Sequence, residues 1–526
     1  MYFLEEVYYL QRLKQFDNTR LKFILKGLLV GLLSGVVVSM FRWLIEISLQ
    51  QAIQLFQWLH FQPVWLLALP VISIALAWLI GMLVKGEPNI MGSGIPQVEG
   101  QLAGDLTIPW WPVLWRKFVA GVLGIGPGLF LGREGPSIQL GAAVGQGVAT
   151  RLGRSDSEKR ILLASGAAAG LSAAFNAPIA GTLFVLEEIY HNFSPLVWMT
   201  SLASAIAADF ISLNFFGLTP VLHIHYAYSF PLALYWQLII LGIVLGLAGF
   251  FYQRVLLALP KWYSKLKWLP RYFQGVIPLL LVIPIGYFWP HALGGGNLVI
   301  LGLAIKLPSF WPLLALFLLR FIFSMISYGS GLPGGIFLPI LTLGALIGAL
   351  LGTLFTQWQW MPQIYIMNFV IFAMAGYFAG IGKAPFTAIL LITEMVGDLR
   401  HLMPLALVSL VAYIVVDVLG GAPIYESLLS RLNFGNTLAR MSGKNDRLEM
   451  PVFAGSPLED KQVRDVKWPQ ESLLIAIRRQ NREVIPHGDT LLRAGDTLIV
   501  LTAHERRGMV RRKLMQVAAK RKNLQT

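Results

Sequence analysis

The chain has 526 residues, of which 56% are hydrophobic and 13% are charged, and its net charge is +15. This composition is that of a polytopic membrane protein and excludes a soluble globular enzyme. There is no cysteine, so disulfide bonds, thiolate metal ligands and a cysteine nucleophile are excluded as well. The 51 glycines and 29 prolines are more than uniform membrane helices need, and they predict broken and re-entrant helices.

Basic residues gather at both ends of the chain. Beyond Asn436 there are 18 Lys or Arg against 10 Asp or Glu, and five more basic residues lie within the first thirty. Because basic segments stay on the cytoplasmic side of a membrane, we expect both termini in the cytoplasm and an even number of crossings. No base-stacking aromatic pattern accompanies these charges, so lipid headgroups are the expected partners and nucleic acid is not.

The first predicted elements lead to a glycine-bounded helix start. Residues 1–20 are expected to form an amphipathic cytoplasmic helix, and spanning segments follow at about 22–50 and 62–85. Gly92-Ser93-Gly94-Ile95-Pro96 then predicts the beginning of a helix. Ser93 could cap this helix or donate its hydroxyl proton to an anion, and the residues alone leave both functions open.

The most informative stretch is Gly132-Arg133-Glu134-Gly135-Pro136, which interrupts an apolar run. An ionisable side chain inside a membrane costs at least a few kcal/mol, so Glu134 needs a reason to be there. Pro136 suits the first turn of a helix, and the unpaired N–H groups of a helix N-terminus attract anions. We therefore expect the Glu134 carboxylate to compete with a permeating anion. A purely structural ion pair between Arg133 and Glu134 is the alternative.

A helix rich in small residues follows and predicts close helix packing. Phe175-Asn176-Ala177-Pro178 interrupts it, and the next helical segment ends with Glu187 and Glu188. The remaining apolar segments are predicted at about 196–216, 231–259, 272–289, 297–327, 336–356, 364–380, 385–399 and 403–419.

The second half of the chain repeats the first. Gly335-Ile-Phe-Leu-Pro339 matches the stretch that begins at Gly132, and Lys383-Ala384-Pro385 up to Glu394 matches Asn176-Ala177-Pro178 up to Glu187. Matching broken helices in two halves predict a transporter whose site lies where the helix ends converge at the membrane midplane. Phe337 stands in the position of Glu134, so one half offers a titratable group and the other offers backbone N–H groups.

Together these motifs resemble the CLC family of chloride channels and chloride/proton exchangers. The resemblance covers about residues 20–432 and includes Tyr425, in Gly421-Ala-Pro-Ile-Tyr425, as a fourth motif. It implies an all-α polytopic membrane domain over residues 21–433, with an inverted-repeat CLC fold of two halves at about 21–216 and 231–432. It also implies a homodimer with one anion pathway per subunit.

The resemblance implies a role for each motif residue. Glu134 would be the external gate, Glu188 the internal proton-transfer residue and Glu99 its support. The Ser93 and Tyr425 hydroxyls and the backbone at Gly135, Ile336 and Phe337 would bind chloride, and Arg133 and Lys117 would belong to the anion pathway.

Glu188 decides between two functions within the family. Family channels typically carry an uncharged residue there, so Glu188 favours a chloride/proton antiporter of the bacterial plasma membrane. A passive voltage- or pH-gated chloride channel is the alternative, with Glu187 and Glu188 merely capping a helix end. Ser93 favours chloride over nitrate, because nitrate-selective relatives usually carry proline there. No enzymatic motif, metal site or cofactor is expected.

The composition changes beyond residue 433. A polar linker is predicted at 434–450, and short strands and turns follow at 451–505. The latter segment resembles the TrkA-C (RCK-C) regulatory domain, a small α/β cytoplasmic module. The resemblance implies a possible small ligand such as cyclic di-AMP, with Arg478, Arg479 and His487 as candidate contacts; a dimer brace without a ligand is the alternative. Residues 506–526 are predicted as a basic tail for anionic lipids.

Overall fold

The computed structural model describes residues 18–152, 155–222, 224, 228–432, 445–470, 472–479, 482–503 and 507–519. The predicted N-terminal amphipathic helix and most of the predicted linker lie outside these residues. The chain divides into two compact units. One contains Met1–Glu99 and Ile108–Arg431, and the other contains Leu432–Thr526 together with the short segment Gly100–Thr107.

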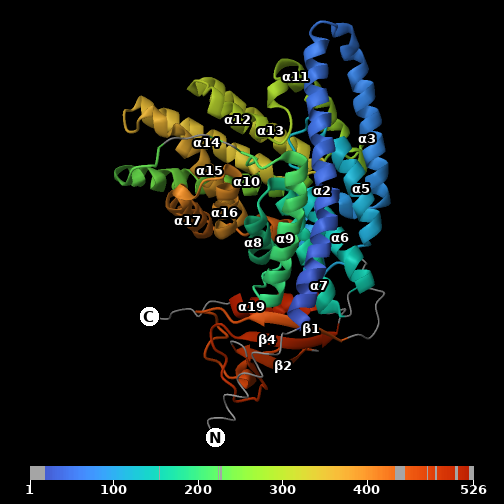
Figure 1. Cartoon of the computed structure of the whole chain (residues 1–526), viewed down its shortest axis with the longest axis vertical. Helices are drawn as coiled ribbons and strands as arrows, with labels where there is room; N and C mark the ends of the chain where they lie inside the picture. The colour runs from blue at the N-terminus through green and yellow to red at the C-terminus, as the bar shows by residue number, and fades with distance from the viewer. Residues whose placement is uncertain are drawn as a thin grey trace. The chain divides into compact units, whose positions relative to one another are not determined.

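The regular elements that the structure describes in the first unit are all helices, and nine of its helices there are long and apolar enough to cross a membrane. Its helices, several joined by short 3₁₀ turns, can be followed in Figure 1. The first half contains α2 (Asn18–Leu59), α3 (Leu69–Gly86), α4 (Ile95–Ala103), α5 (Trp110–Ile125), α6 (Glu134–Leu152), α7 (Asp156–Phe175), α8 (Pro178–Phe184) and α9 (Pro195–Phe216). The second contains α10 (Tyr235–Tyr263), α11 (Val276–Phe288), α12 (Asn297–Ile305), α13 (Phe310–Gly329), α14 (Phe337–Gln357), α15 (Ile366–Gly382), α16 (Pro385–Val396), α17 (Leu402–Val418) and α18 (Ile424–Leu429).

One predicted segment, 297–327, is two helices. The chain leaves the helical conformation after α12 at Lys306, and α13 begins at Phe310. Pro308 explains the break, because proline lacks an N–H donor and disfavours the helical conformation of the residue before it. The sequence pattern missed this interruption because both parts are strongly apolar.

Close helix packing in each half confirms the prediction from the small residues. A Cβ added to Gly141 in α6 would lie 2.1 Å from the carbonyl oxygen of Gly166 in α7. The second half packs α14 against α15 in the same way, because a Cβ on Gly348 would lie 2.4 Å from the carbonyl oxygen of Phe369. Glycine is required where backbones approach this closely.

The two halves also exchange helix caps. The Glu187 carboxylate, just beyond α8, accepts hydrogen bonds from the backbone N–H of Thr387 at 2.8 Å and of Phe386 at 3.3 Å, in the first turn of α16. Glu394, near the end of α16, accepts from Ala180 at 2.7 Å and Ile179 at 3.1 Å, in the first turn of α8. This reciprocity is what an inverted repeat produces, and carboxylates at helix N-termini stabilise them.

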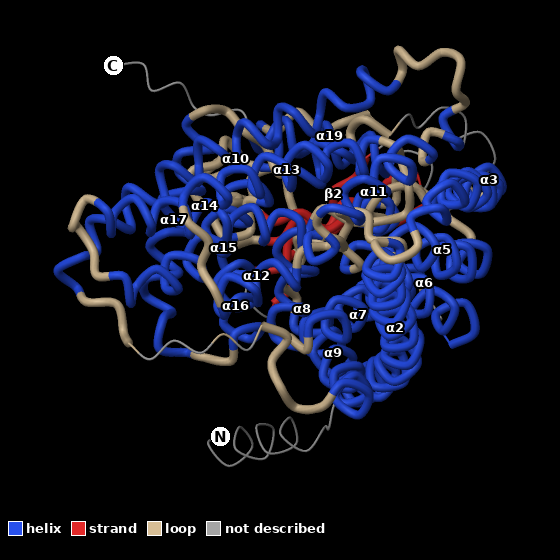
Figure 2. The backbone as a smooth tube through the Cα atoms, turned by 90° about the horizontal axis from the view of Figure 1, so that it is seen from above, coloured by secondary structure: helices blue, strands red, loops and turns tan. Residues whose placement is uncertain are grey.

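The second unit contains one antiparallel sheet of β1 (Asn445–Pro451), β2 (Ser472–Arg479), β3 (Arg482–Val484) and β4 (Thr497–Ala503), in the order β1-β4-β2-β3. Its strands are drawn in red in Figure 2. Helix α19 (Arg507–Ala519) buries Val510 and Leu514 in the same core as the sheet. The boundaries therefore differ from those predicted: β1 begins inside the predicted linker, and α19 takes up much of the predicted tail.

Candidate functional site

Two glycines, one from each half, make the contact on which the site is built. Gly132 donates its N–H to the carbonyl of Gly335 at 2.7 Å, and Gly335 donates back to Gly132 at 2.6 Å. The two residues hold the same position in the sequence repeat. This bridge brings the N-terminal ends of α6 and α14 together, because a Cβ on Gly335 would lie 3.1 Å from the backbone nitrogen of Gly135. Two positive helix ends thus converge, which favours an anion.

Glu134 lies buried at this junction. A Cβ on Gly132 would lie 2.2 Å from Oε2 of Glu134 and 3.2 Å from the backbone nitrogen of Leu338, so glycine leaves room for the carboxylate. Neither oxygen makes a hydrogen bond of good geometry to a described residue, although the N–H groups of Leu338 and of Glu134 itself are nearby donors. The positive charges that act on it are Arg133 and Arg42. Arg133 forms its ion pair with Glu46, at 2.6 Å.

Ser93 packs directly on the start of α6. A Cβ on Gly135 would lie 2.8 Å from the Cβ of Ser93. The Ser93 hydroxyl oxygen accepts a hydrogen bond from the backbone N–H of Ile95 at 3.3 Å. A hydroxyl that accepts can still donate its proton, so both functions left open by the sequence fit one geometry.

Tyr425, in α18, is fully buried, and its hydroxyl has no hydrogen-bond partner among the described residues. Leaving a buried polar group unpaired costs about 1–3 kcal/mol, which a bound anion would offset. The ring packs edge-on against Phe184 with centroids 6.0 Å apart, and Phe184 packs on Phe337 at 5.6 Å. Phe337 begins α14 and Ile336 is its N-cap residue, and helix geometry leaves N–H groups without an intrahelical partner there.

Glu187 and Glu188 have different environments. Both lie in a single π-helical turn, Val185–Ile189, a conformation that is frequent at functional sites. Glu187 is the helix cap described above, whereas Glu188 is buried with one carboxylate oxygen unpaired among the described residues. The negative charges of Glu99, Glu187 and Glu426 act on Glu188. Glu187 therefore fits the alternative of a capping residue, and the function of Glu188 stays a prediction.

Lys117 is buried in α5 and holds the loop that carries Ser93. Its ammonium group donates to the carbonyl oxygens of Ile90 at 2.8 Å and Gly92 at 2.7 Å. These contacts give Lys117 a positioning function for the loop, and its place in the anion pathway stays a prediction.

Sequence reasoning missed three neighbours of the site. Tyr328, in α13, lies beside the residue before Ser93, since its hydroxyl oxygen is 3.6 Å from a Cβ built on Gly92, and no motif pointed to it. Arg42 and Glu46, in α2, form an ion pair at 3.1 Å. Their spacing of four residues inside an apolar helix was a usable signal, because charges in membrane helices are rare and usually functional.

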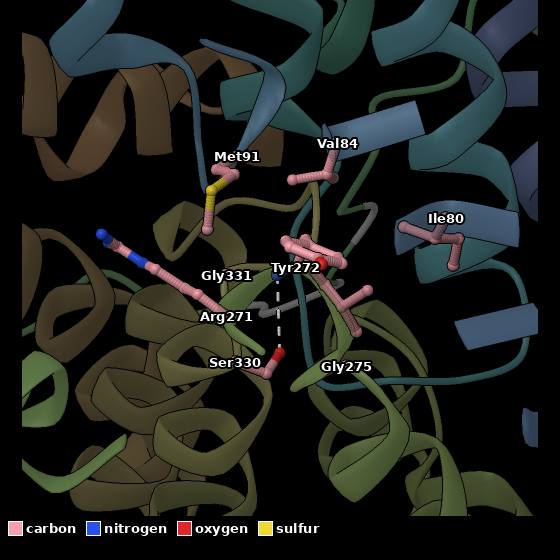
Figure 3. Close-up of a pocket in the computed structure, with 9 residues that line it drawn as sticks. Ile80, Val84, Met91, Arg271, Tyr272, Gly275, Ser330 and Gly331 are labelled. Atoms are coloured by element: carbon pink, nitrogen blue, oxygen red, sulfur yellow. Dashed lines mark hydrogen bonds between the residues drawn. The ribbon is translucent and has the colours of Figure 1, made fainter. Parts of the chain in front are cut away.

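A separate hollow opens beside Met91 (Figure 3). Its lining contains Ile80, Val84, Met91, Arg271, Tyr272, Gly275, Ser330, Gly331 and Leu332. None of the residues predicted to bind chloride or transfer protons lines it, so it is distinct from the site at Glu134.

In the C-terminal domain, both candidate arginines are paired with carboxylates. Arg478 contacts both Glu449 oxygens at 3.2 Å, and Arg479 donates to Asp496 at 2.7 and 2.8 Å. Burial acts to raise the pKa of Asp496, but the hydrogen bonds from Arg479 and from the Arg493 N–H outweigh it and hold the pKa below its ordinary value. Both arginines that were expected to bind a nucleotide are therefore already in ion pairs within the domain. The nucleotide ligand and its contact with His487 stay predictions.

The paired broken helices and the buried carboxylates at their ends define an inverted-repeat membrane transporter. Residues 74–417 match the family model described as voltage gated chloride channel, and residues 448–515 match that of the TrkA-C domain. The chain belongs to the voltage gated chloride channel (CLC) family, and both resemblances drawn from the sequence are confirmed.

The relatives cover most of the chain. It is 34% identical over 465 residues to the H(+)/Cl(-) exchange transporter ClcA of Salmonella arizonae, which is 85% of this chain and 95% of the relative. The protein of the same name from Salmonella paratyphi B gives the same values.

Solved structures share the fold. A slow cyanobacterial Cl-/H+ antiporter matches with 33% identity and a TM-score of 0.73, over 79% of this chain and 98% of that one. A CLC-type fluoride/proton antiporter, at 22% identity and a TM-score of 0.63 over 76% of this chain and 96% of that one, shows the fold alone.

Proposed function

We propose that this protein exchanges chloride for protons across a membrane. The observation that carries the proposal is the Glu134 carboxylate, buried between two converging helix N-termini with no well-formed hydrogen bond to a described residue. Relatives named as H(+)/Cl(-) exchange transporters support this function.

In the proposed cycle, Glu134 and chloride compete for the same place. The ionised carboxylate occupies an anion position, and the protonated side chain swings away and admits chloride. The Ser93 and Tyr425 hydroxyls and the N–H groups near Gly135, Ile336 and Phe337 then bind the ion. Neutral donors and partial charges hold an anion without trapping it.

Glu188 would carry the proton to the other side of the membrane. Its burial beside other carboxylates makes the ionised form costly, so it can take up a proton and pass it on. Glu99, also buried, would support it.

The test uses purified full-length protein in liposomes under an imposed chloride gradient, with a pH electrode outside. We expect protons to move uphill at the expense of the chloride gradient. Glu188→Gln should abolish proton movement while chloride flux persists, and Glu188→Asp, which keeps a carboxyl group, should retain part of it. Chloride flux without proton movement in the unaltered protein would instead establish the passive channel.

We further propose a homodimer in the bacterial plasma membrane with both termini in the cytoplasm. A surface for a second copy or for lipid is formed by exposed apolar side chains on α8, α9, α16 and α17. These include Ile179, Phe210, Phe386 and Ile414, which are 49–68% exposed. Light scattering of the detergent-solubilised protein distinguishes these occupants, because a monomer would leave lipid alone on this face.

The C-terminal domain would regulate this transport and not catalyse a reaction. Binding of cyclic di-AMP would have to draw Arg478 or Arg479 away from its carboxylate. Calorimetric titration of the full-length protein with cyclic di-AMP tests this, and no heat at micromolar nucleotide would favour the dimer brace.

A further inference from the structure

We infer that Glu46, in α2, is a positioning residue of the transport cycle, because its carboxylate holds the two arginines whose charges act on Glu134. The inference rests on the proposed function, in which Glu134 must be protonated for chloride to enter. No motif of the two repeats contains Glu46, and it lies 87 residues from its partner Arg133.

One carboxylate oxygen of Glu46 accepts hydrogen bonds from both arginines. Nη1 of Arg133 lies 2.6 Å from Oε1 of Glu46, and Nε of Arg42 lies 3.1 Å from the same oxygen. The two arginine side chains are about one-tenth exposed, whereas that of Glu46 is 35% exposed. Charge-assisted bonds of this length are the strong ones, and burial of the arginines limits screening.

Arg42 is fixed independently of Glu46. Its Nη1 donates to the Asn176 side-chain oxygen at 2.8 Å, and its guanidinium carbon lies 3.8 Å from the ring centroid of Phe216. Ser212 donates to the same Asn176 oxygen at 3.1 Å. Asn176, the C-cap residue of α7, and Phe216 of α9 thus anchor Arg42.

Arg133 has less support. Its Nε is buried without a hydrogen-bond partner among the described residues, so the ion pair with Glu46 is the contact that holds its guanidinium group. Glu46 therefore ties the arginine next to the gate to a fixed point on α2. It also cancels one of the two positive charges that face Glu134.

The charges around the pair determine the direction of the effect. Arg133 and Arg42 are the charged groups that act on Glu46, and the same two act on Glu134. Arg42 also acts on Asp209, from α9. Neutralising Glu46 would remove the ion-pair partner of Arg133 and one negative charge beside Arg42, so ionised Glu134 would be more stable and more acid would be needed to protonate it.

The test is the pH dependence of chloride efflux from liposomes. We expect Glu46→Gln to move the pH profile about one unit toward acid, as removal of one charge at a distance of several Å predicts. Arg133→Gln removes a positive charge and should shift the profile in the opposite direction. Glu46→Asp, which keeps the charge, should restore part of the normal profile.

Asp417→Asn is the matched control. Asp417 pairs with Lys383, which occupies in the second half the position of Asn176 in the first. This control should leave the pH profile in place. An equal loss of rate at every pH in Glu46→Gln, or an unchanged profile, would overturn the inference and give Glu46 a packing role.

A Glu134→Gln background separates this inference from the proposed function. With no titratable gate, Glu46→Gln should add no further pH shift, and a shift that persists would overturn the inference. Failure of uphill proton transport in the unaltered protein would overturn the proposed exchange instead, and the pH profile of chloride efflux would still report on Glu46.

Discussion

Of the two adjacent glutamates in the π-helical turn, we expect Glu187 to contribute to folding stability and Glu188 to contribute to transport. Glu187 receives two backbone N–H groups and the Thr387 hydroxyl, at 2.7 Å, whereas Glu188 has an unpaired buried oxygen. Glu187→Ala should therefore lower the free energy of unfolding by about 1 kcal/mol, as loss of a helix cap does. Thermal unfolding in detergent measures this. Glu188→Gln should leave the unfolding temperature nearly unchanged, and the opposite ranking would reject the assignment.

The Tyr425 hydroxyl gives a second residue-scale prediction. Tyr425→Phe keeps the ring on Phe184 and removes the donor, so chloride should bind about 2- to 10-fold more weakly, the value of one hydrogen bond. Isothermal titration with chloride measures the change. Tyr263→Phe is the control, because that hydroxyl donates to the Ile326 carbonyl at 2.6 Å, and it should bind chloride normally. Equal effects in both variants would count against a chloride contact at Tyr425.

Individual site residues could be predicted from the sequence where they carry a charge, because charged side chains are rare in a membrane. Glu134 could be found because a glutamate between glycines in an apolar run is costly. Arg133 could be found, but its pairing with Glu46 could not, because that pairing depends on how α2 packs near the start of α6. The same holds for Arg479, because Asp496, the residue before β4, becomes its neighbour only when the sheet forms.

At the scale of the helices, the distance between neighbouring backbones determines whether a glycine can be replaced by a larger residue. Gly166→Val should prevent stable folding, because its Cβ alone would lie 2.1 Å from the Gly141 carbonyl oxygen and backbone cannot yield as a side chain does. The yield of monodisperse protein in size-exclusion chromatography measures this. Gly302→Val, in α12, has nothing within 4 Å of the added Cβ and should be tolerated. Normal yield from Gly166→Val would show that α6 and α7 can separate.

Most helices could be predicted because prolines and glycines mark their ends. Asn176-Ala177-Pro178 and Lys383-Ala384-Pro385 mark such breaks, and Asn176 and Lys383 both adopt left-handed conformations with φ of 53° and 60°. The helix α19 was missed because its basic residues suggested a solvated tail, while Val510 and Leu514 gave too short an apolar pattern to stand out. Tertiary burial decided its structure.

At the scale of the whole molecule, acid should weaken the C-terminal domain. The pKa of Asp496 is held below its ordinary value, so its ion pair stabilises the C-terminal domain above about pH 4 and is lost as the pH falls further. Asp496→Asn should therefore destabilise this domain at pH 7 but not at pH 3. Hydrogen exchange of peptides from β2 and β4 in the full-length protein, corrected for intrinsic rates, measures this. Equal protection in the variant at pH 7 would contradict the prediction.

Because the site depends on the bridge between Gly132 and Gly335, it can form only after both glycines have been synthesised. The two glycines are 203 residues apart. At 5–20 residues per second, the ribosome needs about 10–40 s to reach the second after making the first. Throughout that interval the helix end that follows Gly132 has no partner, because residue 335 has not been synthesised. A chain that is still being synthesised therefore cannot conduct anions through this pathway, because half of the anion site does not yet exist.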